Sequence, residues 1–362
     1  MKVIHFHPSL ASGGIESMIC NLSNVMVDRG VDVTVGTIFA PKESDVFLQR
    51  LDKRVKFVSL GKVKEGFSIF ELFKIYREIR RNKYDVVHLH GFIYYYVIAI
   101  LLLHRKVKFF YTVHSDASRE SAPWDVRLMP LKRFFFRHAW VKPITISKAS
   151  QESFLSFYGM DSMMVHNGVV KPRVDDSPNI IDDFRLTNKT KVFVHPGRIS
   201  RAKNQVMLCQ VFSRLISEGN DIVLVIAGSN QNQQIFSQIE PLFCDRIRYI
   251  GERNDVTSLL NKADAFCLSS IWEGLPITLL EALSVGCIPI CTPVGGIVNV
   301  VKDGLNGLLS SSCEEDDYYV AIKRFLSMSD VDNLKMKDNC NISFEPYNIE
   351  SSVTGYLECY KS

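Results

Sequence analysis

The chain has 362 residues, of which 46% are hydrophobic and 23% are charged, and its formal net charge is +4. This length and composition are those of a globular protein with two domains of ordinary size. Its nine cysteines are scattered, odd in number and without C-x-x-C pairs, which argues against a disulfide framework and a zinc site and favours a reducing compartment.

Charge is unevenly distributed between the two halves of the chain. Residues 1–170 hold 24 Lys/Arg and 15 Asp/Glu, a net of +9, whereas residues 171–362 hold 19 and 24, a net of −5. A basic first half suits an anionic membrane surface or a phosphorylated acceptor, although a merely solvated basic face is an equally good interpretation. No nucleic-acid reader motif is found, so no nucleic-acid partner is predicted.

The sequence contains neither a signal peptide nor an apolar run long enough for a membrane span. Its longest uncharged apolar run, residues 91–104, falls short of the ~20 residues that cross a bilayer. We therefore expect a cytoplasmic protein, or one that is peripheral on the inner face of the cell membrane.

In the first half, segments of strand type alternate with segments of helical type. The pattern predicts strands at 2–7, 31–37, 56–60, 85–90, 108–114 and 142–147, with residues 163–169 closing this half. Apolar residues at helical spacing predict a helix that ends at Gly30 and an amphipathic helix with a basic end over 67–82. Such alternation predicts a parallel sheet with buried faces.

A polar segment with two prolines, residues 171–190, is interpreted as an interdomain linker. The alternation then begins again, with strands predicted at 191–197, 221–229, 246–251, 264–270 and 288–291 and helices at 204–219, 255–263 and 276–286. The predicted fold class is therefore α/β, with two Rossmann-like doubly wound domains, 1–170 and 191–344, that face each other across a cleft. Ligands of such sheets bind at the carboxyl ends of the strands. The last segment, 345–362, is predicted to be an amphipathic helix.

Residues 269–307 concentrate features that suit a phosphorylated, hydroxyl-rich ligand. Pro276 opens a helix, and helix N-termini attract anions through free backbone N–H groups and the macrodipole. Glu273 precedes this helix, Glu281 lies in its second turn, and the diglycine Gly295-Gly296 follows the next strand. Glu281 could merely complement the helix dipole, but its apolar neighbours favour a buried acid that needs a partner.

Three other places contribute candidate residues. Gly13-Gly14 follows the first strand and is either an ordinary turn or a loop whose backbone approaches a phosphate or sugar closely. Arg198 and Lys203 lie between a strand and a helix, where they could neutralise a diphosphate or be solvated surface cations. His114 ends a strand at the expected cleft.

The remaining histidines and the acid pairs receive weaker assignments. His88 and His90 are expected near the cleft, whereas no role is assigned to His5, His7, His138 and His166. No acid pair is expected in a cleft loop, because the pairs lie in the linker or in a late acidic run: Asp175-Asp176, Asp182-Asp183 and Asp316-Asp317. We therefore expect no essential metal. The basic aromatic segment 132–140 suits an interfacial membrane patch and a core stripe with outward cations equally well.

These motifs together resemble the retaining glycosyltransferases of family 4, which have the glycosyltransferase-B fold. Glu273 and Glu281 match the E-x7-E signature, and the other motifs match in chain order. The resemblance implies His114, Arg198, Lys203 and Glu273 as catalytic residues, and Gly13, Gly14, Arg198, Lys203, Glu273, Gly274, Leu275, Pro276, Glu281, Gly295 and Gly296 as donor-binding residues. In this family the C-terminal segment crosses back to the first domain. One departure is Asn299, which stands where the family commonly has an acid.

The resemblance also implies a role for each main candidate. Glu281 would hold the ribose, Glu273 the transferred hexose, and Arg198 and Lys203 the diphosphate, while His114 would contact the sugar or the phosphate. The predicted function is retaining transfer of a hexose-type sugar from a nucleoside diphosphate sugar, with UDP-sugar favoured over GDP-sugar, to a hydroxyl of a glycan or lipid-linked acceptor.

The expected setting is cell-envelope polysaccharide or lipopolysaccharide synthesis, and no cofactor is expected. Two other functions remain open at this point. A sugar-nucleotide epimerase shares the two-domain architecture, and a non-catalytic sugar-nucleotide sensor would share the binding residues.

Overall fold

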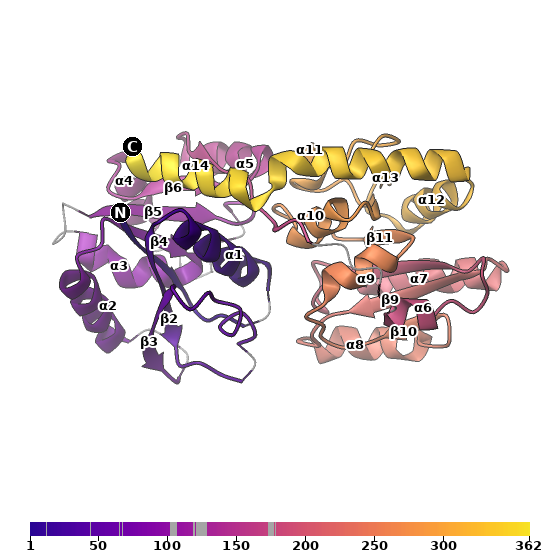
Figure 1. Ribbon diagram of the computed structural model, residues 1–362, viewed down its shortest axis with the longest axis horizontal. Coiled ribbons are helices and arrows are strands. Elements are labelled where there is room, and N and C mark those ends of the chain that lie inside the picture. Colours follow the sequence, from indigo (N-terminus) through magenta and orange to yellow (C-terminus); the bar gives the residue numbers. More distant parts are fainter. Residues whose placement is uncertain are drawn as a thin grey trace. The chain divides into compact units, whose positions relative to one another are not determined.

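The computed structural model describes all residues except 12, 44, 65, 67, 102–106, 119, 121–128, 173–176 and 178. Met1–Val170 and Tyr347–Ser362 form one compact unit, and Lys171–Pro346 form a second (Figure 1). Part of the expected linker, including Asp175 and Asp176, lies outside the described residues. No helix in the described part of the chain is long and apolar enough to cross a membrane.

The first unit is built on a seven-stranded sheet in which every strand pair is parallel. The strand order is β3-β2-β1-β4-β5-β6-β7. The strands are β1 (Lys2–His7), β2 (Asp32–Phe39), β3 (Lys56–Lys62), β4 (Val86–His90), β5 (Lys108–Val113), β6 (Lys142–Thr145) and β7 (Met163–Met164). The order reverses between β1 and β4, and the carboxyl ends of strands at such a switch point form the usual ligand crevice of an open α/β sheet.

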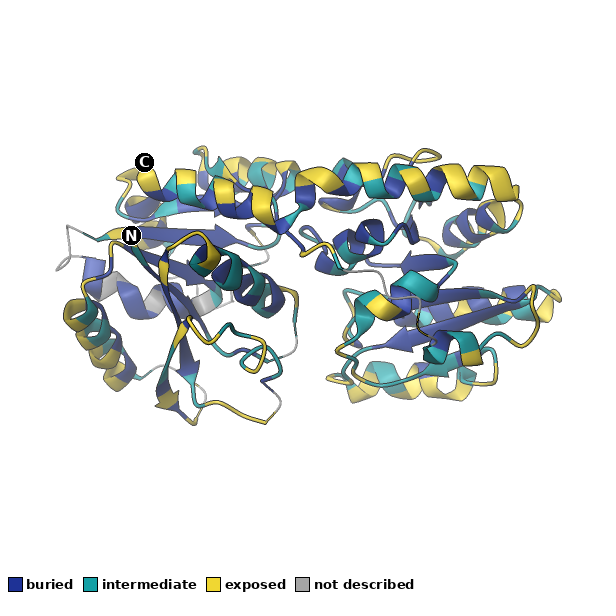
Figure 2. Cartoon of the chain, in the orientation of Figure 1, coloured by how far each residue is buried: buried dark blue, intermediate teal, exposed yellow. Residues whose placement is uncertain are grey.

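The helices of the first unit follow its strands, as the alternating pattern predicts. They are α1 (Gly14–Asp28), α2 (Ile69–Asn82), the short 3-10 turn η1 (Gly91–Ile93), α3 (Tyr94–Leu101), α4 (Met129–Arg137) and α5 (Lys148–Tyr158). The central strands are buried on both faces, for example all five residues of β4 (Figure 2).

The C-terminal helix α14 (Ile349–Lys361) belongs to the first unit, although the chain from Lys171 up to Pro346 belongs to the second. It packs on α1, where Arg29 donates from Nη1 to Thr354 Oγ1 at 2.7 Å and from Nε to Glu350 Oε2 at 3.1 Å. On its inner side Tyr356 and Tyr360 are fully buried. The last helix is therefore part of the core of the first unit.

The second unit is a six-stranded, all-parallel sheet of order β10-β9-β8-β11-β12-β13. Its strands are β8 (Lys191–Pro196), β9 (Ile222–Ala227), β10 (Ile247–Tyr249), β11 (Ala265–Leu268), β12 (Ile288–Cys291) and β13 (Leu308–Leu309). Its helices are α6 (Ile180–Asp183), α7 (Gln205–Ser217), α8 (Gln233–Ile239), η3 (Glu240–Leu242), α9 (Val256–Lys262), α10 (Ile277–Ser284), α11 (Ile297–Val300), α12 (Glu315–Leu326), α13 (Asp330–Phe344) and the turn η4 (Glu345–Tyr347) that leads into α14.

The prediction of two α/β units with parallel sheets is confirmed, and the differences lie in single elements. Residues 163–169, which close the first half, contain the two-residue strand Met163–Met164, and Val169 forms a bridge with Asn348 of the C-terminal segment. The expected linker contains the short helix α6. Helix α10 begins one residue after Pro276, which occupies the N-cap position with an extended backbone.

Candidate functional site

Two loops meet at the carboxyl ends of β8 and β11, the neighbouring strands at which the order of the second sheet reverses. The loop after β8 carries Arg198 and Lys203, and the loop after β11 carries Ser270 and Glu273. Backbone contacts join them, because the N–H of Ile271 donates to the carbonyl of Ala202 at 2.8 Å. The sheet order therefore brings together residues that lie about 70 positions apart in the sequence.

An ion pair forms the centre of this loop junction. Lys203 Nζ lies 2.7 Å from Glu273 Oε1, and Ser270 Oγ donates to the same carboxylate oxygen at 2.6 Å. The Lys203 and Glu273 side chains are only 19% and 13% exposed. Both distances are those of charge-assisted hydrogen bonds, so the two charges compensate each other in a partly desolvated place.

The diglycine packs directly against the loop that carries Glu273. Gly295 has a left-handed backbone with φ 53°, and a Cβ atom there would collide with the backbone carbonyl of Glu273. The N–H of Gly296 donates to the carbonyl of Gly274 at 2.7 Å. Gly295 thus permits an approach that a side chain would block. Leu275 and Pro276 follow this contact and are buried at the start of α10.

Two other predicted residues of the second unit lie on the loop after β8 and on helix α10. Arg198 is exposed, and its Nη1 lies 3.5 Å from Gln231 Oε1, a long contact. Its position is held through its backbone, because Gln205 Nε2 donates to the carbonyl of Arg198 at 2.8 Å. Glu281 lies in the second turn of α10, as predicted, and is partly exposed.

In the first unit, Gly13 and Gly14 form the start of α1. Gly13 is its N-cap residue with an extended backbone, and Gly14 is its first helical residue. A Cβ atom on Gly13 would collide with the carboxylate of Glu16, whose Oε1 lies 4.0 Å from His7 Nδ1. The glycine loop therefore lies beside an acid and a histidine that the sequence did not single out.

His114 follows β5 and is held from two sides. Its Nε2 lies 3.0 Å from Nδ1 of His90, and its backbone N–H donates to Oε1 of Glu120. The same carboxylate oxygen accepts from the N–H of Ser115 at 3.1 Å. Burial, with a smaller contribution from His7, lowers the pKa of His114 to about 3, and burial raises the pKa of Glu120 to about 7. His114 is therefore neutral at physiological pH.

The structure changes the assignment of four other histidines. His5 and His7 were given no role, yet both lie on β1 at the switch point, and His5 lies in a group with His88 and His90. His88 and His90 were expected near the strand edge and are fully buried there. A sequence signal existed, since β1 and β4 each end in His-x-His, a spacing that places both histidines of a strand on one face.

Comparisons with known proteins identify the family. The model of Glycosyltransferase Family 4 matches residues 12–171, and the model of Glycosyl transferases group 1 matches residues 176–341. The UDP-Gal:alpha-D-GlcNAc-diphosphoundecaprenol alpha-1,3-galactosyltransferase of Escherichia coli is 25% identical, over 88% of this chain and 87% of that protein. The chain belongs to the family 4 glycosyltransferases.

Solved structures show that this glycosyltransferase has the glycosyltransferase-B fold. A glycosyltransferase from Rickettsia africae ESF-5 superposes with a TM-score of 0.83 at 16% identity, covering 99% of this chain and 97% of that one. HepE of Anabaena, in complex with UDP and glucose, superposes with a TM-score of 0.81 at 18% identity, covering 100% and 99%. The epimerase alternative finds no support among these comparisons.

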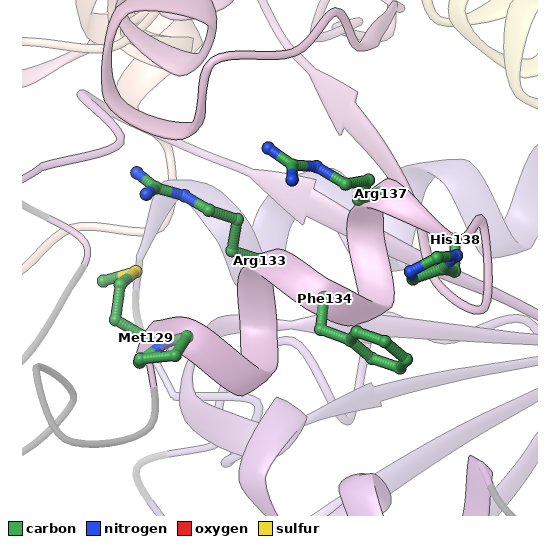
Figure 3. A pocket seen from close by; sticks show the side chains of 6 residues that line it. Met129, Arg133, Phe134, Arg137 and His138 are labelled. Atoms are coloured by element: carbon green, nitrogen blue, oxygen red, sulfur yellow. The ribbon is translucent and has the colours of Figure 1, made fainter.

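The basic aromatic segment of the glycosyltransferase, residues 132–140, has a buried side, as predicted for a core stripe, and an exposed side, for which a membrane contact stays a prediction. Phe135 and Phe136 of α4 are buried in the core, whereas Phe134 is 46% exposed. Arg133 and Arg137 project from one side of α4 (Figure 3). A surface hollow of about 480 Å³ is lined by Met129, Pro130, Arg133, Phe134, Arg137 and His138. The helix therefore stabilises the core with one face and offers a cationic, aromatic surface with the other.

Proposed function

We propose that this glycosyltransferase transfers a hexose-type sugar from a nucleoside diphosphate sugar, with a UDP-sugar favoured over a GDP-sugar, to a hydroxyl of a glycan or lipid-linked acceptor, with retention of the anomeric configuration. The setting proposed is cell-envelope polysaccharide or lipopolysaccharide synthesis. The observation that carries this proposal is the Lys203–Glu273 ion pair at the carboxyl ends of β8 and β11. It joins a cation suited to a diphosphate with an acid suited to a sugar that gains positive charge.

The roles of the two partners follow from the charge that develops as the glycosidic bond breaks. Negative charge accumulates on the leaving diphosphate, and the Lys203 ammonium, with three N–H donors, can keep Glu273 and still donate to a phosphate oxygen. Positive charge accumulates on the hexose, which the Glu273 carboxylate stabilises. Arg198 is exposed beside this loop and would supply a second, planar contact to the diphosphate.

Retention is proposed to follow front-face departure of the diphosphate. The departing phosphate then takes the proton of the attacking hydroxyl, so no second carboxylate at glycosidase spacing is needed. Glu281, in α10, is proposed to hold the ribose hydroxyls, a contact made equally in the ground state and the transition state. Because Lys203 and Arg198 supply the positive charge, the reaction is proposed to need no metal and no cofactor.

Two surfaces of the basic first unit support a lipid-linked acceptor and peripheral binding to the inner face of the membrane. The Escherichia coli relative acts, by its name, on a diphosphoundecaprenol-linked sugar. The α4 surface described above is one candidate. The other is α2, where Ile69, Phe70 and Phe73 are 57%, 73% and 61% exposed in the first turns, and Arg80 and Arg81 lie in the last turn. Aromatic side chains next to cations suit an anionic interface.

Donor screening tests the central proposal. Thermal shift with UDP, GDP and their sugars should single out one nucleotide, since a ligand at 100 times its dissociation constant adds ~2.7 kcal/mol to the free energy of unfolding. The selected donor, with an acceptor extract, should yield a glycosylated product in the presence of a chelator. Arg198→Ala should weaken binding of the nucleoside diphosphate. Stabilisation by no nucleotide, or activity that returns only with magnesium, would contradict the proposal.

Vesicle sedimentation tests the membrane part separately. The protein should sediment with anionic vesicles at low salt, less so at high salt, and little with neutral vesicles. Replacing Phe70 and Phe73 by serine should reduce this binding without changing nucleotide affinity. Val320→Ser, a matched change of an apolar residue that is 53% exposed in the second unit, should leave it unchanged. Equal binding to both kinds of vesicle would contradict membrane binding through these surfaces, and the basic face of the first unit would then be merely solvated.

A further inference from the structure

Four histidines gather at the switch point of the first sheet. His5 of β1 pairs in register with His88 of β4, and His90 of β4 pairs with Thr112 of β5, two residues before His114. Their rings lie close together, with centroid distances of 4.3 Å between His88 and His90, 5.5 Å between His5 and His90, and 5.2 Å between His90 and His114. His5, His88 and His90 are fully buried.

Three of these histidines form a hydrogen-bonded chain that leads to His114. His5 Nδ1 lies 3.2 Å from His90 Nε2, and His90 Nδ1 lies 3.0 Å from His114 Nε2. Burial lowers the pKa of all three imidazoles, so each is neutral. A neutral imidazole has one N–H donor and one acceptor nitrogen. All the N–H groups of the chain must therefore point the same way, either outward toward His114 or inward toward His5.

The inner end of the chain decides between these two directions. His5 Nε2 is buried and has no hydrogen-bond partner among the described residues. In the inward direction this nitrogen would carry an N–H with nothing to accept it. In the outward direction it would carry only an unused lone pair. Orphaned buried N–H donors are rarer than under-used acceptors, so the outward direction is favoured.

The groups around the chain do not reverse this choice. His88 stacks on His90 but is satisfied elsewhere, with Nδ1 2.5 Å from Tyr360 Oη and Nε2 2.7 Å from Thr112 Oγ1. The ring nitrogens of His5, His88 and His90 lie close enough to hold a metal ion, but these two hydrogen bonds already use both nitrogens of His88. His7 Nδ1 donates to the carbonyl of Ser9 at 2.7 Å and lies 4.0 Å from Glu16 Oε1, outside the chain.

We propose that His5 and His90 are positioning residues that hold His114 in its Nδ1–H form, so that His114 presents a hydrogen-bond donor to an oxygen of the substrate. Nδ1 of His114 has no hydrogen bond to any described residue, which leaves it available for this contact. That substrate is the sugar or phosphate of the donor, and this part rests on the function proposed above. The tautomer itself follows from the chain alone and can be read without any substrate.

The tautomer is read from ¹⁵N-histidine spectra of the full-length protein without ligand. Long-range ¹H–¹⁵N correlations distinguish a protonated, pyrrole-type nitrogen from an unprotonated, pyridine-type one. The His114 signals are assigned by their loss in His114→Gln. We expect Nδ1 of His114 to be pyrrole-type and Nε2 to be pyridine-type in the wild-type protein. The reverse pattern, or a positively charged ring at pH 7, would overturn the proposal even if neither His90 variant folds.

Variants of His90 link the tautomer to transfer. His90→Phe breaks both bonds of the chain, so His114 should lose its single Nδ1–H pattern and kcat/KM should fall about 10- to 100-fold, the equivalent of one hydrogen bond to a charged group. His90→Gln retains a donor and an acceptor and should restore much of both. His88→Gln, equally buried on the same strand but outside the chain, should leave the His114 spectrum unchanged.

The two readouts separate the inference from the proposed function. An unchanged His114 spectrum in folded His90→Phe would refute the positioning role, whatever the activity. A changed spectrum with unchanged kcat/KM would refute the use of His114 as a donor while leaving the transferase intact. If the wild-type protein transfers no sugar from any donor, the proposed function fails, and the wild-type spectrum still decides the tautomer.

Discussion

The Lys203–Glu273 ion pair predicts an unequal response when each partner is replaced by glutamine. Lys203→Gln removes the cation proposed for the diphosphate, whereas Glu273→Gln removes a negative charge that repels the same diphosphate. We therefore expect Lys203→Gln to weaken UDP binding about 10- to 100-fold. Glu273→Gln should leave UDP affinity equal or slightly higher, but should lower kcat by about 10²- to 10³-fold.

The stability effect of the pair follows from its geometry. At 2.7 Å, with side chains 19% and 13% exposed, it is a charge-assisted hydrogen bond with little access to water. Such bonds contribute about 1.5–3 kcal/mol to the free energy of unfolding. Because both side chains keep some exposure to water, we expect about 2 kcal/mol for this one. Each single variant should lose about that much free energy of unfolding. The double variant should lose about the same, because it leaves neither charge unpaired, which corresponds to a coupling energy of about 2 kcal/mol.

Urea denaturation and calorimetric UDP titration of the wild-type protein, both single variants and the double variant measure these quantities. Lys191→Gln is the matched control, since Lys191 pairs with Asp264 at 3.3 Å at the opposite end of β8. Its UDP affinity should not change. A coupling energy below about 0.5 kcal/mol, within the error of additivity, would refute the energetic reasoning. Equal loss of UDP affinity in Lys203→Gln and Glu273→Gln would refute the division of roles.

Three further predictions concern Glu281, Gly295 and the buried histidines of the first unit. Glu281→Gln should mainly raise the KM for the donor, because its proposed ribose contact is the same in ground state and transition state; steady-state kinetics would contradict this if kcat alone fell. Gly295→Ala should nearly abolish transfer in a folded protein, checked by circular dichroism, because the new Cβ would push the Glu273 loop away. The free energy of unfolding should fall from about pH 6.5 downward, by up to about 1.4 kcal/mol per pH unit for each of His5 and His114, whose pKa values lie near 3 in the folded state. The pKa of Glu120 is raised to about 7, so its protonation increases the free energy of unfolding over the same pH range and offsets part of this loss. A urea midpoint that does not change between pH 7 and 5 would contradict neutral buried histidines.

The fold was predictable where local pattern and packing agree. The apolar run at 221–229 contains β9, whose six residues are all buried, because a strand inside a parallel sheet needs apolar side chains on both faces. Local pattern could not predict how the first half ends, because the backbone of Val169 bonds Tyr347 and Ile349 of the distant C-terminal segment. Helix α13 was not predicted either, since its buried residues form only a narrow stripe: Met336, Cys340 and Phe344.

The candidate site was predictable as a set of residues but not as a set of contacts. Lys203 and Glu273 could each be placed after a strand from their local sequence. That they form one ion pair depends on β8 lying next to β11, and strand order is not encoded in either loop. The histidine chain was missed for a related reason. Alternation shows that His88 and His90 share a face, but only the register shows that His5 shares it too.

The Lys203–Glu273 ion pair and the histidine chain both have their polar groups largely paired before any substrate binds. Lys203 is neutralised by Glu273, and the histidines of β1 and β4 remain uncharged while bonding one another. A substrate therefore exchanges hydrogen bonds with these groups instead of meeting bare charges, which limits the affinity gained in the ground state. In the proposed reaction, the gain increases only as the bond to the diphosphate breaks and new charge appears on both fragments. Interactions that strengthen in this way raise kcat more than they lower KM, which is the pattern that the Glu273→Gln kinetics examine.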